Sequence, residues 1–276
     1  MTPAGIPAPT EQNADETNLH PVARFFRSLG DALTAELGNC RDTVYARLES
    51  VATDMLAKWN PSAQVTPDQI IDYVLTASAL CKQADLDGRF AEPPVSLYAG
   101  EHFDISALFW LDGTTSIHQH GFCGAFHVLS GSSIHSQYRF ERHEVNAESE
   151  SGSPLHADDA MCPAIAETQP RAIEGTLHLV GCEVLHAGST RTIRRGQGFI
   201  HALFHMVRPS VTIVVRTITD DPKQNVQYDY RWPGFGFDPF HRHAPTIRTQ
   251  QFLKMLQKLD MTGYQARLLE VLRVPI

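Results

Sequence analysis

Two histidines separated by one residue, His118 and His120, are the side chains in this sequence best suited to chemistry. They stand at the expected end of a strand, in Ile117–Gly121. Side chains alternate across a strand, so residues two apart point to the same face, where two imidazoles can converge on one metal ion. The chain has 14 histidines, and such a pair also arises by chance. The opposing interpretation is therefore a pair of hydrogen-bonded core or turn residues.

The residues around this pair resemble the first of two sequence motifs of the cupin superfamily. The run Gly113–Gly131 begins with a glycine, contains both histidines and ends in a glycine that fits a turn. Further along, Gly196–His201 is similar to the second motif, in which a glycine-containing turn delivers a third histidine into a β-barrel. The resemblance implies a metal site formed by His118, His120 and His201.

One position of the first motif narrows the resemblance. Many cupins carry a glutamate a few residues after the histidine pair as a fourth ligand, whereas this chain has Gly124, followed by Ala125. Three histidines without a carboxylate are the pattern of the cysteine dioxygenase-like thiol dioxygenases, and Phe109–His120 is similar to their metal-binding strand. Many bacterial members have glycine at the Gly124 position. The similarity covers roughly Val95–Thr219.

This resemblance implies a non-heme iron(II)-dependent dioxygenase that oxidises a small molecule with O₂. Three neutral imidazoles leave about three positions open on an octahedral iron, enough for a substrate bound through two atoms together with O₂. With a thiol substrate, the implied reaction adds oxygen to sulfur and yields a sulfinate. Iron(II) is assigned from the resemblance alone, because imidazole ligands suit zinc, copper and nickel as well.

The sequence departs from the thiol dioxygenases where they handle substrate. Their serine–histidine–tyrosine relay follows the third ligand, and the matching strand here presents Thr212, Val214 and Arg216 on one face, where only Thr212 is chemically close. The arginine that clamps the carboxylate of cysteine is also missing, because Ser96–Trp110 contains none. Thr212 and Arg216 are therefore the candidate catalytic residues. Arg216 replaces the clamp from a new direction, forms a salt bridge, or lies at an exposed end of its strand.

His205 is a third candidate catalytic residue. It lies four residues after His201, and on a continuing strand it faces the same way. It therefore contacts the substrate, supports the metal ligands, or packs in the core. Other histidines, including His127 and His135, have no converging partner recognisable in the sequence and are assigned structural or surface roles.

These departures leave two alternatives beside the dioxygenase. One is a metallo-cupin of another reaction type, such as a non-thiol oxygenase or an isomerase. The other is a non-catalytic ligand-binding cupin. The presence of all three histidines argues against the second, because a barrel without metal has no physical need of them.

The elements that position these residues fall into helical and strand-rich regions. Apolar residues recur at helical spacing from Val22 to Leu37 and from Val44 to Met55, within a helical region at 19–92. Thr66–Gln69 predicts a capping box that starts a third helix, whose expected buried face is Ile70, Ile71, Val74 and Leu75. Helical spacing returns at 246–276, and the proline-rich, acidic residues 1–18 are expected to be a disordered lead-in.

Between the helical regions the chain favours short strands, and we assign 93–245 to a cupin barrel. Phe103–Trp110 and Ser210–Ile218 are rich in β-branched and aromatic residues. Many strands without intervening helices predict a barrel or sandwich. The polar stretch 146–175 is expected to be a long surface loop. The predicted fold class is mainly β: a jelly-roll-like cupin β-barrel with added N-terminal and C-terminal α-helices.

Composition limits the partners. A net charge of −8 without a concentrated basic surface argues against nucleic acid, and no segment reaches the ~18 consecutive apolar residues of a membrane span. The five cysteines are scattered and odd in number, and no secretory signal is recognisable at the start, which favours a cytoplasmic protein. We expect a small-molecule substrate and O₂ as partners. The resemblance to cupins, which often form dimers, extends this expectation to a homodimer.

Overall fold

A computed structural model describes residues 19–77, 80–83, 91–111, 114–143, 172–218, 227–231, 235–237 and 263. The helices within these residues come first: α1 (Pro21–Leu37), α2 (Arg41–Trp59), α3 (Pro61–Gln64) and α4 (Pro67–Thr76). The strands are β1 (Pro94–Ala99), β2 (Phe103–Trp110), β3 (Ile117–Gln119), β4 (Gly124–Arg142), β5 (Ala172–His186), β6 (Thr190–Ile193), β7 (Ile200–Thr217), β8 (Asp229–Arg231) and β9 (Phe235–Phe237). A short 3₁₀ turn, η3 (Gly196–Gly198), precedes β7.

Several sequence expectations lie outside the described residues. These are the lead-in at 1–18, the C-terminal helices at 246–276 apart from residue 263, and most of the loop expected at 146–175. The end of that loop was placed too late, because residues 172–175 already belong to β5. Among the described helices, none combines the length and the apolar character that a bilayer crossing needs.

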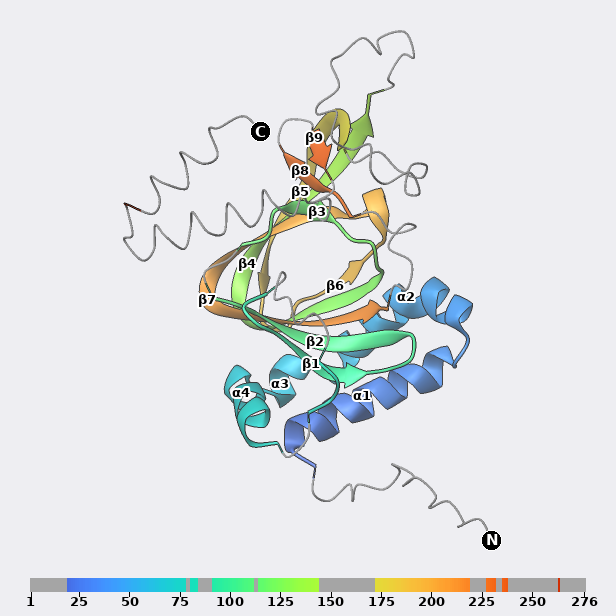
Figure 1. The fold of residues 1–276 in the computed structure, drawn as a ribbon, viewed down its shortest axis with the longest axis vertical. Helices are drawn as coiled ribbons and strands as arrows, with labels where there is room; N and C mark the ends of the chain where they lie inside the picture. Colours follow the sequence, from blue (N-terminus) through green and yellow to red (C-terminus); the bar gives the residue numbers. More distant parts are fainter. Residues whose placement is uncertain are drawn as a thin grey trace.

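The helices form a layer on the outer side of β1 and β2 (Figure 1). The apolar spacing predicted for the first two helices is confirmed, because residues such as Phe26, Leu33 and Leu48 are fully buried in one cluster with the strands. This cluster joins the helices to Ile105 and Ile213 of the sheet. The helical region therefore shares a core with the barrel wall instead of forming a core of its own.

The start of α4 is as predicted, but of the four residues predicted as its buried face only Ile70 is buried. Thr66 Oγ1 accepts a hydrogen bond from the backbone N–H of Gln69 at 3.2 Å, and Gln69 Oε1 accepts one from Thr66 N–H at 2.9 Å. The buried residues of the helix are Ile70 and Tyr73. Three of the four residues predicted as its buried face are partly or largely exposed: Ile71 by 46%, Val74 by 36% and Leu75 by 78%. Ile70 and Tyr73 lie three residues apart, which is one face of a helix.

The strands form a mainly antiparallel barrel, as the sequence predicted. Its closed circuit runs β7–β3–β8–β9–β5–β4 and returns to β7. β1 and β2 extend the sheet from β7, and β6 pairs with the first part of β4. Figure 1 shows this ring of strands seen along its opening. A closed circuit satisfies the backbone groups that a sheet edge would leave unpaired.

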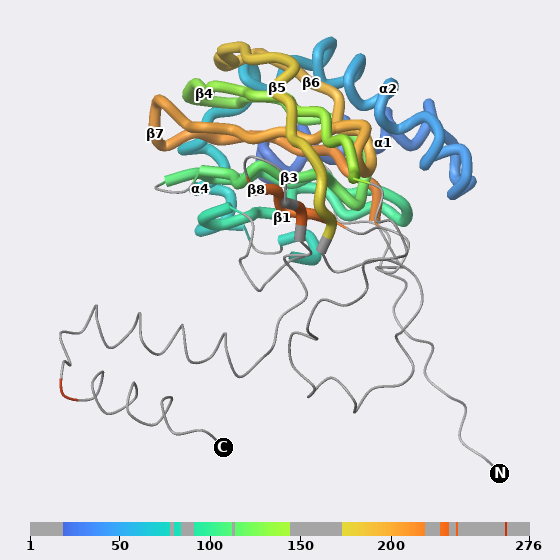
Figure 2. The backbone as a smooth tube through the Cα atoms, turned by 90° about the horizontal axis from the view of Figure 1, so that it is seen from above, coloured from blue at the N-terminus to red at the C-terminus, as the bar shows by residue number. Residues whose placement is uncertain are grey.

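Two long strands, β4 and β7, bend so that each contributes to both ends of the barrel. They run side by side for most of their length (Figure 2). The register shifts between Val128 and Ser133, and Gly131 there has a φ of +86°. A Cβ at Gly131 would lie 2.9 Å from the carbonyl oxygen of Val207, so glycine permits the bend and the close approach of β7.

β2 connects the helical layer to the barrel interior. All eight of its residues are buried, including the polar Asp104 and Ser106. One face, with Ile105 and Phe109, packs in the helical cluster. The other face, with Ser106, Leu108 and Trp110, lines a cavity inside the barrel. The helices therefore support one wall of that cavity.

Candidate metal centre

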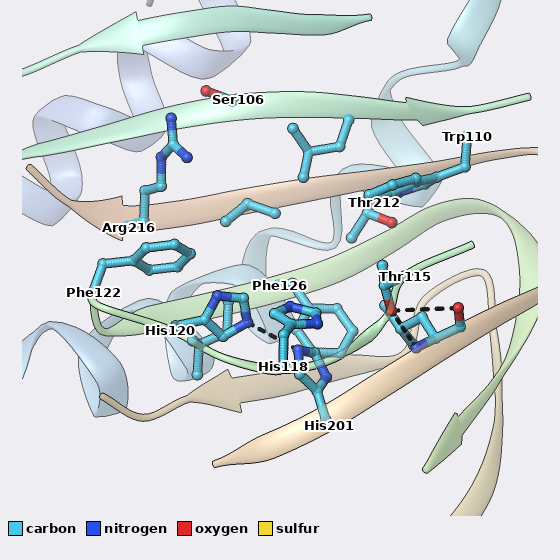
Figure 3. A pocket seen from close by; sticks show the side chains of 14 residues that line it. Ser106, Trp110, Thr115, His118, His120, Phe122, Phe126, His201, Thr212 and Arg216 are labelled. Atoms are coloured by element: carbon cyan, nitrogen blue, oxygen red, sulfur yellow. Dashed lines mark hydrogen bonds between the residues drawn. The ribbon is translucent and has the colours of Figure 1, made fainter. Parts of the chain in front are cut away.

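Three histidines meet inside the barrel. His118 belongs to β3, His120 follows directly after it, and His201 is the second residue of β7. His118 and His201 are opposite each other in the β3–β7 ladder. All three side chains are buried, and their nearest ring nitrogens lie within 4.8 Å of one another. Figure 3 shows the rings gathered on one wall of the cavity.

Hydrogen bonds orient two of the three rings. His118 Nδ1 lies 2.8 Å from the carbonyl oxygen of Ser116, which can only accept, so this nitrogen carries the proton. His201 Nδ1 lies 3.0 Å from Nε2 of His135, a further buried histidine. These contacts leave the Nε2 atoms of His118 and His201 as the nitrogens that face the cluster.

The histidines are suited to bind metal because they are held neutral. Burial lowers the pKa of His118 below its ordinary value. It lowers the pKa values of His120 and His201 further, and the neighbouring imidazole of His118 adds to the effect. Neutral imidazole is the form that coordinates a metal ion, since protonation removes the lone pair.

The spacing of the nitrogens fits a shared ion. Nε2 of His120 lies 2.9 Å from Nε2 of His201. Two nitrogens bound at right angles to one ion at about 2.1 Å would lie about 3 Å apart. Nδ1 of His120 is buried and has no hydrogen-bond partner among the described residues. The cluster therefore has the donor set of a divalent metal site.

Gly124 explains why no side chain can stand where many cupins have a glutamate. Its φ is +156°, and it lies opposite Arg216 in the β4–β7 ladder. A Cβ built there would overlap the backbone carbonyl oxygen of Val215. Any residue other than glycine would force the two strands apart, so the backbone itself excludes a carboxylate from this position.

The three histidines border a small cavity of about 40 Å³. The other lining residues are mostly apolar or aromatic: Leu108, Trp110, Phe122, Phe126, Ile193, Leu203 and Val214. Polar groups in the lining are few, namely Ser106, Thr115, Thr212 and Arg216. An apolar cleft with a few polar groups is the usual form of a small-molecule site.

Arg216 lines the cavity, and its anionic partner is within the chain. Its Nε donates to both oxygens of Asp104 on the neighbouring strand, at 3.1 and 3.3 Å. The two residues face each other in the β2–β7 ladder. Burial raises the pKa of Asp104, and the guanidinium opposes that rise. The salt bridge that the sequence left open for Arg216 is therefore present (Figure 3 shows Arg216 across the cavity from the histidines).

The other two candidate catalytic residues differ in position. Thr212 lines the cavity together with Val214 and Arg216, as the alternation of β7 predicted. His205 is not among the lining residues. It is buried, its Nδ1 lies 2.8 Å from the hydroxyl of Ser133, and its ring stacks on Trp110 at 4.9 Å between centroids. It therefore lies behind Trp110, which lines the cavity.

Sequence reasoning missed His135. It was assigned a structural or surface role, but it is fully buried and bonded to the candidate ligand His201. The alternation of β4 could have indicated its inward direction, since Ser133 and His135 are both buried. His127, by contrast, has the structural role predicted. Its Nδ1 bonds the hydroxyl of Thr190, and its Nε2 accepts from the backbone of Ser62.

Comparisons with known proteins add the following. No family profile and no curated protein matches the sequence. Among solved structures, the chain is similar to a recombinant oxalate oxidase in complex with glycolate, with 18% identity, a TM-score of 0.30, and coverage of 66% of this chain and 74% of that chain. It is similar to the DMSP lyase DddQ from Ruegeria pomeroyi DSS-3, with 14% identity, a TM-score of 0.34, and coverage of 74% and 94%.

A third similar structure is the hydroquinone 1,2-dioxygenase PnpCD in complex with Cd²⁺ and 4-hydroxybenzonitrile. The identity is 14% and the TM-score 0.27, and the match covers 46% of this chain. This chain spans 64% of the length of that one. TM-scores this low say nothing about the reaction, so the function is argued from the residues of the site.

Proposed function

We propose that this protein is a non-heme iron(II)-dependent dioxygenase of the cupin type, which oxidises a small, largely apolar molecule with O₂. The observation that carries the proposal is the cluster of three buried, neutral imidazoles on the wall of an apolar cavity. His118, His120 and His201 would hold the metal. When bound, iron(II) supplies redox chemistry and open coordination positions.

The residues of the cavity indicate the class of substrate. Most of the lining is apolar, and the cation in it, Arg216, is already paired with Asp104. A substrate carboxylate would have to compete with Asp104 for the guanidinium, at a desolvation cost that the apolar walls do not repay. We therefore propose a substrate without a carboxylate, either a neutral thiol or a neutral non-thiol, in preference to cysteine.

The roles of individual residues follow from their positions. Phe122, whose ring centroid lies 4.5 Å from that of His120, excludes water from the space next to the histidines, and the hydroxyl of Thr212 is a polar group available to orient a substrate. Arg216 and Asp104 together present a neutral pair. Among the described lining residues there is no carboxylate to serve as a general base, which agrees with chemistry led by the metal.

A second candidate function is a zinc-dependent lyase or isomerase. It is favoured by the donor set, because three neutral histidines with an open fourth position also suit catalytic zinc. The identity of the metal taken up separates the two candidates, since zinc has no redox chemistry to offer O₂.

The first experiment measures the metal content of protein purified without added metal or chelator. We expect about one iron per chain, and its loss in the His118→Ala variant. His127→Gln is the matched control, because His127 is an equally buried histidine that lies outside the cluster. No metal in the wild type, and none taken up from added iron(II), would refute the proposal.

The second experiment measures O₂ consumption by the iron-loaded protein with neutral and carboxylate-bearing compounds of similar size. 2-Mercaptoethanol and a neutral phenol are expected to support faster consumption than cysteine or 3-mercaptopropionate. Faster consumption with the carboxylates would refute the proposed substrate class. Zinc content without O₂ consumption on any compound would favour the lyase or isomerase.

A further inference from the structure

A series of hydrogen-bonded side chains leads from the candidate ligand His201 to the barrel surface. Nδ1 of His201 lies 3.0 Å from Nε2 of His135, and Nδ1 of His135 lies 3.0 Å from Oε1 of Glu183. Arg191 donates through Nε to Oε1 of Glu183 at 2.9 Å and through a second nitrogen to Oε2. His135 is fully buried, and the side chain of Glu183 is 33% exposed.

The barrel register brings these residues together. His135 stands in the middle strand β4, directly opposite Glu183 of β5 on one side and Leu203 of β7 on the other. His201 lies two residues before Leu203, so it shares that face of β7. The series of hydrogen bonds therefore crosses three adjacent strands, β5, β4 and β7, and it forms only when their pairing register is the one observed.

The direction of each hydrogen bond follows from Glu183. The guanidinium of Arg191 is the main reason that the pKa of Glu183 is lowered, to about 2, so this carboxylate is ionised and can only accept. Nδ1 of His135 must then carry a proton and donate it. Nε2 of His135 is its other ring nitrogen and faces Nδ1 of His201. A neutral imidazole that binds metal through Nε2 carries its proton on Nδ1, so Nδ1 of His201 donates to Nε2 of His135, and Nε2 of His201 faces Nε2 of His120 and the proposed metal position.

We propose that Glu183 and His135 are positioning residues for the metal ligand His201, and that they fix its ring orientation and its tautomer and strengthen its electron donation. The proposal rests on the three-histidine metal site proposed above. A carboxylate at the end of such a chain makes the ligating imidazole more basic, and outer partners of this kind typically change metal affinity by about 10–100-fold.

His127 shows what a purely structural histidine looks like on the same strand. It is as fully buried as His135, but its partners are a threonine hydroxyl and a backbone N–H, both uncharged. Burial of a histidine on β4 therefore requires neither a carboxylate nor a second histidine. The hydrogen bonds that begin at the charged Glu183 lead through His135 to the candidate ligand His201.

The test compares metal affinity and the visible spectrum of bound cobalt(II) in four variants and the wild type. His135→Leu removes the acceptor of His201, and we expect cobalt(II) and zinc(II) to bind about 10–100-fold more weakly. His135→Gln can place an amide oxygen near the position of Nε2, and it should restore part of the affinity. Glu183→Gln keeps a neutral acceptor for His135 and should weaken binding about tenfold.

Arg191→Gln is the matched control, because it removes the exposed salt bridge but keeps the carboxylate that accepts from His135. We expect less than a threefold change of affinity and an unshifted cobalt(II) spectrum. The Glu183→Gln and His135→Leu variants should shift the cobalt(II) bands, which a loss of stability alone would not do. Since Glu183 is partly exposed, the Glu183→Gln variant decides the question if His135→Leu does not fold.

The outcomes separate this inference from the proposed function. A wild type that binds neither cobalt(II) nor zinc(II) overturns both. A wild type that binds metal, together with Glu183→Gln and His135→Leu variants of unchanged affinity and spectrum, overturns the positioning role alone. An Arg191→Gln variant as impaired as Glu183→Gln would also overturn it, because the effect would then come from the salt bridge.

Discussion

Replacing Gly124 should destabilise the barrel strongly, because this glycine has both a positive φ and a neighbour that leaves no room for a side chain. For Gly124→Ala, the strained backbone costs about 1 kcal/mol, and the overlap of the new Cβ with the carbonyl oxygen of Val215 adds about 3 kcal/mol as the strands shift. For a chain of this size, a loss of about 4 kcal/mol lowers Tm by roughly 8–16 °C.

Gly196 supplies the control for this prediction. Its φ is also positive, at +67°, but a Cβ there would meet nothing within 4 Å. Gly196→Ala should therefore cost only the backbone strain, about 1 kcal/mol, or roughly 2–4 °C. Both variants are compared by thermal unfolding followed by circular dichroism, with chelator present so that metal binding does not shift Tm.

The same reasoning predicts that Gly124→Glu does not create a fourth metal ligand. The variant should lose stability as Gly124→Ala does, and its affinity for cobalt(II) should fall instead of rising. Equal losses of Tm in Gly124→Ala and Gly196→Ala would refute the steric argument. So would a Gly124→Glu variant that keeps the wild-type Tm and binds metal more tightly.

Two further predictions concern charge. Burial lowers the pKa values of His127 and His205 to about 4, so both histidines stay neutral in the folded protein until the pH falls to about 4. In the unfolded protein the same histidines have their ordinary pKa near 6.5 and take up protons below that pH. The free energy of unfolding is therefore unaffected by these histidines above pH 6.5 and decreases as the pH falls towards 4. At pH 5 the decrease is about 2 kcal/mol for each histidine. Urea unfolding at several pH values measures this, and a His127→Gln variant with the same pH dependence as the wild type would contradict it. Asp104→Asn leaves Arg216 charged in an apolar cavity and should cost about 2–3 kcal/mol. Added formate or acetate should recover part of that loss by binding the guanidinium that has lost its partner. An unchanged Tm without any effect of the anions would show that the salt bridge between Asp104 and Arg216 does not contribute to stability.

Strands buried on both faces were the most predictable part of the fold. Phe103–Trp110 was predicted as a strand and is β2, and Ser210–Ile218 coincides with the second half of β7. The two pair along their whole common length, from Phe103 opposite Thr217 to Trp110 opposite Ser210. Their β-branched and aromatic residues favour a strand locally, so the prediction needed no knowledge of neighbours.

The face of α4 shows where local reasoning failed. Ile70, Ile71, Val74 and Leu75 are all apolar, and a helix of ten residues has too few turns for its periodicity to select one stripe. Its packing selected Ile70 and Tyr73 instead. Capping was predictable, because Thr66 and Gln69 interact within one turn.

The sequence alone determined that the chain is mainly β with helices before the barrel, and it determined which histidines to consider as ligands. His118 and His120 share a face because of their spacing, and the glycine-containing turn before His201 is also local. Only the tertiary structure decided that Asp104 neutralises Arg216, that His205 lies behind Trp110, and that His135 links Glu183 to His201. Each of these contacts joins residues on different strands, so it depends on register and barrel closure, which no local pattern specifies.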